Sequence, residues 1–163
     1  MNLIVTGAED YTKEWNVFDA LDYYCTKTTS PMVIVTGGGK GADAAALLWT
    51  TSINLYNNNS VDLFEIPAHW TAPCAPWCPS KHRVRKGFRT QCPSAGSFRN
   101  ERMLLSMPDV VLTFGSSPIV ADLVTQALTA QALTRGITVM DGERLLESSE
   151  YLLWKNRSIN EGR

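Results

Sequence analysis

The stretch that decides the fold is residues 33–43, which read Val33-Ile34-Val35-Thr36-Gly37-Gly38-Gly39-Lys40-Gly41-Ala42-Asp43. It begins as a β-branched apolar run, which is typical of a buried strand. Four glycines in five residues follow, and the sequence then becomes rich in alanine and leucine, which favour a helix. The stretch therefore predicts a strand, a glycine turn and a helix in succession.

A turn of this kind suits phosphate binding. Glycines let the backbone approach an anion closely, and the first N–H groups of a helix have no intrahelical partner. Lys40 could add a positive charge at the turn. The spacing matches neither the dinucleotide fingerprint nor the P-loop. A tight strand–helix connection without a ligand explains these residues equally well, so both interpretations stay open here.

The composition indicates one domain with a sizeable core, because 44% of the 163 residues are apolar. A net charge of -1 gives no overall sign of a nucleic-acid binder. No apolar run is long enough to cross a bilayer, and residues 1–7 do not resemble a signal peptide. We therefore expect a cytoplasmic protein without a membrane partner, whose four cysteines are reduced or metal-bound.

Apolar runs alternate with helical patterns along the chain. Runs at residues 3–6, 33–36, 61–66, 109–114 and 137–140 predict five strands, and residues 57–60 read as a loop. Helical patterns cover residues 15–25, 42–56, 96–105, 119–134 and 143–155, with Ser97 as an expected N-cap for the third. The alternation predicts an α/β fold, a single Rossmann-like doubly wound parallel sheet with a Cys/His-rich insert. We expect one domain over residues 1–155, with the insert at residues 68–95 and a frayed tail at residues 156–163.

Ligands of such sheets bind at the carboxyl ends of the strands, near the point where the strand order reverses. Arg99 near a helix N-terminus could clamp a phosphate, or it could pair with Glu101 or Asp109. Asp43 could contact a ribose or a metal, or it could simply favour the first turn of its helix. The candidate ligand-binding residues are Thr6, Gly7, Gly37, Gly38, Gly39, Lys40, Gly41, Asp43, Arg99, Asn100, Gly115 and Ser116.

Four motifs occur in a recognisable order: residues 5–7 (Val-Thr-Gly), 36–43, 99–103 (Arg-Asn-Glu-Arg-Met) and 111–114 (Val-Leu-Thr-Phe). Together they resemble the YspA-like (DUF2493-type) group of the Rossmann-like SLOG superfamily, over about residues 2–141. The group is common in actinobacteria and their phages. The resemblance implies binding of a nucleotide or nucleotide-derived metabolite, as a sensor or in phage–host nucleotide signalling, in the host cytoplasm if the protein is phage-encoded.

The chain departs from that pattern in two loops. Glu9 stands where the first loop usually carries an arginine, and residues 116–120 (Ser-Ser-Pro-Ile-Val) replace a glycine-rich loop. The lonely-guy phosphoribohydrolases of the superfamily have a catalytic glutamate at the position of Leu123, and leucine cannot act on a ribosyl bond. A nucleoside monophosphate hydrolase is therefore the disfavoured enzyme alternative, and no catalytic residue is assigned.

The insert is rich in proline, cysteine and basic residues, and no secondary structure is predicted in it. Three thiols and an imidazole, Cys74, Cys78, His82 and Cys92, form a donor set that is common in structural zinc sites. A bound metal would order a segment that has no core of its own. The alternatives are a loop with free thiols, a Cys74–Cys78 disulfide, or His69 as a substitute ligand. Cys25 lies apart and is expected in the core.

The insert also carries a basic cluster with aromatic neighbours. Such a cluster could bind single-stranded nucleic acid, which we rank second, or cover the nucleotide pocket, or simply be solvated. Exposed apolar helix faces could support a homo-oligomer. The residues of the cluster are Lys81, His82, Arg83, Arg85, Lys86 and Arg89, with Trp70, Trp77 and Phe88 nearby.

Overall fold

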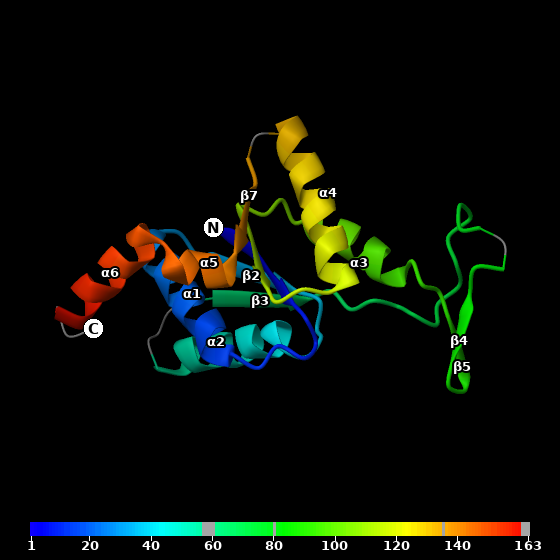
Figure 1. Cartoon of the computed structure of the whole chain (residues 1–163), viewed down its shortest axis with the longest axis horizontal. Helices are drawn as coiled ribbons and strands as arrows, with labels where there is room; N and C mark the ends of the chain where they lie inside the picture. The colour runs from blue at the N-terminus through cyan, green and yellow to red at the C-terminus, as the bar shows by residue number, and fades with distance from the viewer. Residues whose placement is uncertain (57–60, 80, 135, 161–163) are drawn as a thin grey trace.

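A computed structural model of the chain describes residues 1–56, 61–79, 81–134 and 136–160. Five parallel strands form one sheet in the order β3-β2-β1-β6-β7, with helices on both faces (Figure 1). This confirms the predicted doubly wound α/β fold. The strands are β1 (Asn2–Gly7), β2 (Met32–Thr36), β3 (Val61–Glu65), β6 (Val110–Phe114) and β7 (Thr138–Asp141). The helices are α1 (Glu14–Lys27), α2 (Ala42–Tyr56), α3 (Ala95–Leu104), α4 (Pro118–Thr134), α5 (Gly142–Glu147) and α6 (Ser149–Asn160).

The strand order reverses beside β1. The chain runs outward from β1 through β2 to β3, and then returns to the other side of β1 for β6 and β7. In the register, Ile4 lies beside both Val35 of β2 and Val111 of β6. The carboxyl ends of β1 and β6 therefore flank the reversal, which is where open parallel sheets bind ligands.

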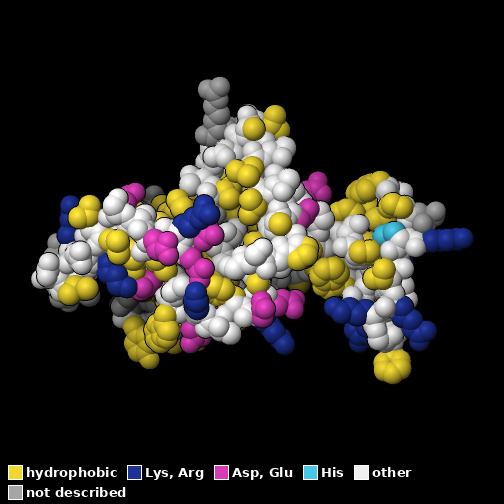
Figure 2. Space-filling view, viewed as in Figure 1, with side chains coloured by type: hydrophobic (Ala, Val, Ile, Leu, Met, Phe, Trp, Pro, Cys, Tyr) yellow, Lys and Arg dark blue, Asp and Glu magenta, His cyan; other side chains and the backbone are white. Residues whose placement is uncertain are grey.

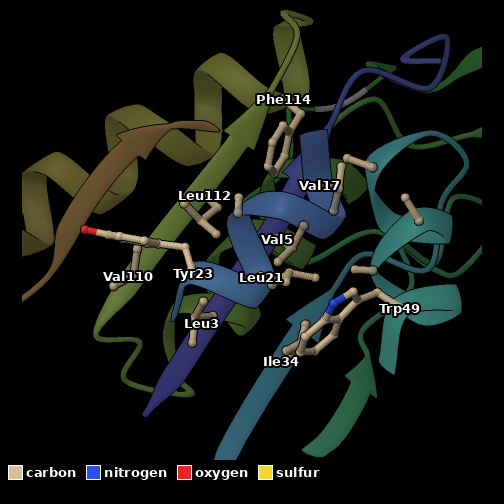
Figure 3. Packing of buried hydrophobic residues seen from close by; sticks show 14 of the residues in the cluster. Leu3, Val5, Val17, Leu21, Tyr23, Ile34, Trp49, Val110, Leu112 and Phe114 are labelled. Atoms are coloured by element: carbon tan, nitrogen blue, oxygen red, sulfur yellow. The ribbon is translucent and has the colours of Figure 1, made fainter. Parts of the chain in front are cut away.

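Alternating side chains of β1 bury two hydrophobic clusters. Leu3 and Val5 face a cluster with residues of α1, α2, α5 and α6, whereas Ile4 faces a smaller cluster with residues of α3 and α4. Figure 3 shows Val17 and Leu21 of α1 packed over the strands of the larger cluster. Because successive strand residues point to opposite faces, one central strand anchors both helix layers.

The C-terminal helix differs from the single helix predicted at residues 143–155. Asp141 caps α5 through hydrogen bonds from the N–H groups of Glu143 and Arg144. Ser148 is extended and separates α5 from α6, and its hydroxyl accepts from the Tyr151 N–H. The helix α6 then runs to Asn160, into the segment predicted to fray, because Tyr151 and Trp154 pack on the larger cluster.

The insert also contains more regular structure than predicted. The strands β4 (Val84–Lys86) and β5 (Arg89–Gln91) form an antiparallel hairpin that projects away from the sheet (Figure 1). Gly87 and Phe88 make the turn, and Gly87 has a φ of 61°. A positive φ at only the first loop residue fits a type II′ turn. The two strands of the hairpin have only three residues each, which is too short to show the periodicity by which strands are recognised in sequence.

The expected N-cap of α3 is wrong. Ser94 precedes the helix, which begins at Ala95, and Ser97 lies inside it. The Ser97 hydroxyl instead donates to Asp122 of α4 at 3.1 Å. The loop predicted at residues 57–60 lies outside the described residues. No helix among the described residues is both long and apolar enough to cross a membrane.

Candidate functional site

A cavity of about 830 Å³ opens at the carboxyl ends of the strands, beside the reversal point. Loops that follow β1, β2, β3 and β6 line it, together with the first turn of α2 and Arg99 of α3. The structure brings nine of the predicted ligand-binding residues to this cavity. They are Thr6, Gly7, Gly37, Gly38, Gly39, Lys40, Asp43, Arg99 and Ser116.

The glycine turn is held by side chains of its own segment. The Gly39 N–H donates to Asp43 Oδ2 at 3.0 Å, and the Gly38 N–H donates to Thr36 Oγ1 at 3.3 Å. Asp43 thus lies in the first turn of α2, which was one of the two roles considered for this carboxylate. These amides are not free to hold phosphate unless the turn rearranges, so Lys40 and Arg99 are the main positive groups for an anion.

Asp43 keeps one oxygen without a hydrogen-bond partner. The residue lines the cavity and is only 5% exposed, and Oδ1 has no partner among the described residues. Burial raises the pKa of Asp43, while the Gly39 N–H, the Arg99 guanidinium and the Gly37 N–H act in the opposite direction. A buried unpartnered oxygen costs free energy, so this atom is ready to accept a hydrogen bond from a ligand.

Arg99 lies against the glycine turn. A Cβ built on Gly37 would lie 1.6 Å from Nη1 of Arg99, so the guanidinium fills the space that the glycine leaves open. Burial lowers the pKa of Arg99, and Asp43, Asp122 and Glu9 oppose that shift. Among the described residues Arg99 forms no ion pair with Glu101 or Asp109, which were the alternative partners. Asp109 instead accepts from the Asn2 N–H at 2.7 Å.

Asn100 does not line the cavity, but it positions groups that do. Its Oδ1 accepts from Arg99 Nε at 3.0 Å, and its Nδ2 donates to the Ile119 carbonyl at 2.9 Å and to Asp122 at 2.8 Å. Asp122 also accepts from Gln126 at 2.9 Å. This network joins α3 to the first turns of α4. A direct sugar contact by Asn100 stays a prediction.

Two predicted glycines also lie outside the lining. Gly41 and Gly115 have φ values of 67° and 69°. A Cβ on Gly41 would come within 2.3 Å of the Ala8 carbonyl, so glycine is needed there for a close backbone approach. Gly41 and Gly115 therefore shape the turns around the cavity and do not line it.

The cavity includes carboxylates that were not among the candidates. Glu9 and Asp10 follow β1, and Trp70 reaches the cavity from the start of the insert. The strand pattern of the sequence is enough to locate the loop that holds Glu9 and Asp10. The position of Trp70 could not be predicted in this way, because the insert shows no hydrophobic periodicity. With Asp43, the carboxylates outnumber Lys40 and Arg99, so this is not a simple anion cradle.

A second site lies in the insert, away from the sheet. The ligand atoms of Cys74, Cys78, His82 and Cys92 all lie within 4.8 Å of one another, so the group can hold a metal ion. Nε2 of His82 is 3.3 Å from the Cys74 sulfur and 3.1 Å from the Cys92 sulfur. Tetrahedral zinc would place such N and S ligands roughly 3.6 Å apart, which small shifts achieve. The four cysteines are free thiols, and His69 is not part of the group.

The surroundings of this group suit metal ligation. Nδ1 of His82 lies 2.5 Å from the Pro79 carbonyl. A carbonyl can only accept, so Nδ1 carries the proton and Nε2 is left as the ligand atom. Nη1 of Arg83 donates to the Cys74 sulfur at 3.3 Å. Burial opposes ionisation of Cys92, but hydrogen bonds from His82, the Ser94 N–H and the other two thiols lower its pKa to about 7. The thiolate is the form that binds metal.

Part of the chain is similar to a known protein family. Residues 1–72 match the family described as YAcAr: YspA, cpYpsA-related SLOG family. The N-terminal part of the chain is therefore similar to YspA-like SLOG proteins. The matched segment contains β1, α1, β2, α2, β3 and the glycine turn.

No curated protein matches the chain. Among solved structures, MurG of Acinetobacter baumannii aligns at a TM-score of 0.46 and 14% identity, over 85% of this chain and 33% of MurG. The chain thus spans about one third of the length of MurG.

Proposed function

We propose that the cavity binds a nucleotide or a nucleotide-derived metabolite. The observation that carries the proposal is that Lys40 and Arg99 both line a cavity beside the reversal point of the sheet, and the cavity is large enough for such a ligand. The match of residues 1–72 to a SLOG family supports a nucleotide-related ligand. Phosphate would lie near Lys40 and the start of α2, where the helix dipole favours an anion.

The carboxylates that line the cavity restrict which kinds of ligand can bind there. A bare phosphate could pair with Lys40 and Arg99, but it has no donors to offer the carboxylates of Glu9, Asp10 and Asp43. A nucleotide carries ribose hydroxyls and base N–H groups as well as phosphate. Those donors can satisfy the carboxylates, including the unpartnered Oδ1 of Asp43. We therefore infer a ligand with both phosphate and several hydroxyl or N–H donors, and a sensor is the role that such binding supports.

Calorimetric titration of the whole protein with AMP, ADP, ATP, ADP-ribose and NAD tests the proposal. Lys40 is exposed, so Lys40→Ala should keep the fold and weaken binding by about tenfold, the effect of losing one charge-assisted contact. Gly39→Val should abolish binding, because its side chain would crowd Asp43 and the cavity. Arg157→Ala, on the exposed side of α6, is the matched control. Absence of binding by the folded protein, or unchanged affinity in Gly39→Val, would overturn the proposal.

A phosphoribohydrolase remains the alternative, and the surroundings of Leu123 argue against it. Leu123 is buried with Met103 and Ala127 in the smaller hydrophobic cluster, and it does not line the cavity. The side chains around Leu123 in that cluster are apolar, and the carboxylates that line the cavity are Glu9, Asp10 and Asp43. Release of free base from a nucleoside monophosphate would establish the alternative.

We propose that the insert binds zinc and that this zinc has a structural role. Three thiolates and one imidazole fill all four positions of tetrahedral zinc, which leaves none for an activated water. Native mass spectrometry should find one zinc per chain, lost on denaturation. A protein purified without chelators that carries no metal, or carries iron, would contradict this assignment.

A further inference from the structure

The charge of the chain is divided unevenly. We define the finger as residues 70–92, which the hydrogen bond from the Cys92 N–H to the Trp70 carbonyl closes at its base. The finger contains five lysines and arginines and no aspartate or glutamate, whereas the rest of the chain contains ten cations and sixteen carboxylates. Figure 2 shows Lys and Arg side chains gathered around the hairpin and the acidic side chains on the body. The net charge of -1 conceals this separation.

One of the five cations supports the fold of the finger. Arg83 donates to the Ala72 carbonyl at 2.8 Å and to the Thr90 carbonyl at 2.9 Å, so it ties the hairpin to the loop before it. The other four differ. Within the described residues Lys81, Lys86 and Arg89 donate no side-chain hydrogen bond, and Arg85 donates to the Gly87 carbonyl alone, at 3.2 Å. None of them forms an ion pair within the described part of the chain.

The tip of the hairpin places like charges opposite each other. Lys86 pairs directly with Arg89 across the two strands, so their side chains share one face. Like charges in this position destabilise a hairpin. Arg85, opposite Thr90, presents a further cation on the other face. The stability of the fold does not explain this arrangement, but an anion between the side chains would relieve the repulsion.

Phe88 lies at the same tip and is fully exposed to solvent. It makes no ring contact in the described structure, whereas Trp77 of the finger packs edge to face against Phe98. A large apolar side chain gains nothing from this position in the isolated protein. Its face is open, and cations flank it on both strands.

We propose that the hairpin tip binds single-stranded nucleic acid. Arg85, Lys86 and Arg89 contact phosphates, and Phe88 stacks on an unpaired base. Cations that follow a backbone and an aromatic ring that stacks on bases are the two elements of sequence-tolerant recognition of single strands. This function goes beyond the proposed nucleotide site, since none of these four residues lines the cavity.

An anionic membrane is the other surface that could meet cations and an exposed aromatic ring. Membrane insertion is driven by buried apolar area, and here one ring lies between Lys86 and Arg89 with glycine before it. A single ring among charges suits one base better than a bilayer. The structure therefore favours nucleic acid, and vesicles become a competing arm of the test.

The test is fluorescence anisotropy of a labelled 15-nucleotide single strand with the whole, metal-loaded protein. With three phosphate contacts, the slope of log K against log salt should be about -2, so affinity should fall about 20-fold from 50 to 200 mM salt. Lys86→Ala with Arg89→Ala should lower affinity and reduce the slope to about -0.7. Phe88→Ala should weaken binding at least about fivefold without changing the slope. Arg157→Ala and Tyr56→Ala remove an exposed cation and an exposed aromatic ring elsewhere, and should bind as wild type.

The changed residues are exposed, so no variant should unfold at a lower temperature than the wild type. Absence of binding at 50 mM salt would overturn the proposal, as would equal loss in the controls. Tighter binding to duplex than to single strands would also overturn it, because a stacked base pair gives Phe88 no free face. Binding to vesicles containing phosphatidylglycerol but not to the oligonucleotide would replace it with a membrane contact.

Discussion

Gly37 and Arg99 come from different layers of the fold and occupy adjoining space. A Cβ at Gly37 would lie 1.6 Å from Nη1 and 2.6 Å from Cζ of Arg99. The absence of a side chain at the end of β2 therefore allows a guanidinium from α3 to reach the cavity. This relationship explains why a glycine is required at a position whose φ is not in the left-handed region.

Gly37→Ala should displace the Arg99 guanidinium. Because Arg99 is buried and bonded to Asn100, we expect unfolding free energy to fall by about 1–3 kcal/mol, with a loss of nucleotide affinity. Urea denaturation and calorimetric titration measure the two effects. Gly39→Ala is the control for stability alone, because the nearest atom to its Cβ would be Asp43 Oδ2 at 3.1 Å and the loss of unfolding free energy should be smaller. Equal midpoints for Gly37→Ala and wild type would refute this account of Arg99.

Asp43→Asn should change how stability depends on pH. Since burial raises the pKa of Asp43 in the folded state, the native protein binds a proton more tightly than the unfolded chain does. The stabilising contribution of that proton is complete at low pH and is lost as pH rises through the folded pKa. Asparagine keeps an oxygen for the Gly39 N–H and removes the charge.

The measured quantity is the unfolding free energy of Asp43→Asn minus that of wild type, from about pH 4 to pH 8. This difference should rise with pH. A difference that falls with pH would mean that Arg99 and the turn amides outweigh burial, and that the pKa of Asp43 is lowered instead.

Asn100→Ala should lower the unfolding free energy by a large amount for a single substitution. It would leave the Ile119 carbonyl and Asp122 without the Asn100 donor, and Arg99 Nε without its acceptor. Loss of buried partners costs about 2–3 kcal/mol, and nucleotide affinity should fall because Arg99 is no longer oriented. Asn16→Ala removes an amide that donates to the part-buried Tyr11 hydroxyl and to the partly exposed Glu143, and should cost much less. Similar losses in both variants would argue against the network.

Cys78→Ser should remove the bound metal and unfold the finger, while the sheet remains folded. Neither hydrophobic cluster contains a residue of the finger, so the sheet does not depend on it for burial. Metal analysis and amide hydrogen exchange at residues 83–92 would show the loss, and chelation of the wild type should reproduce it. Cys25→Ser removes a cysteine outside the group and should keep the metal. Retained protection of the hairpin without metal would refute the role of the metal in ordering it.

Local pattern was sufficient to predict much of this protein. The β-branched run before Gly37 and the alanine-rich run after Gly41 predict β2 and α2, and the repeated alternation predicts a parallel sheet. The hairpin was missed because three-residue strands show no usable period. The break at Ser148 was missed because it depends on caps by Asp141 and Ser148, each a single hydrogen-bonding side chain within an otherwise helical run.

The amino-acid sequence by itself determined the order of strands and helices, the glycine turn at the end of β2, and a thiol and imidazole set of metal-ligand type. Those properties follow from periodicity and side-chain chemistry, which act over a few residues. Only the tertiary structure decided that Arg99 fits into the space left by Gly37, that Glu9 and Asp10 face the same cavity, and that Lys86 meets Arg89 at an exposed tip. These relationships depend on the packing and pairing of separate segments, and local propensity carries no information about the distance between such segments.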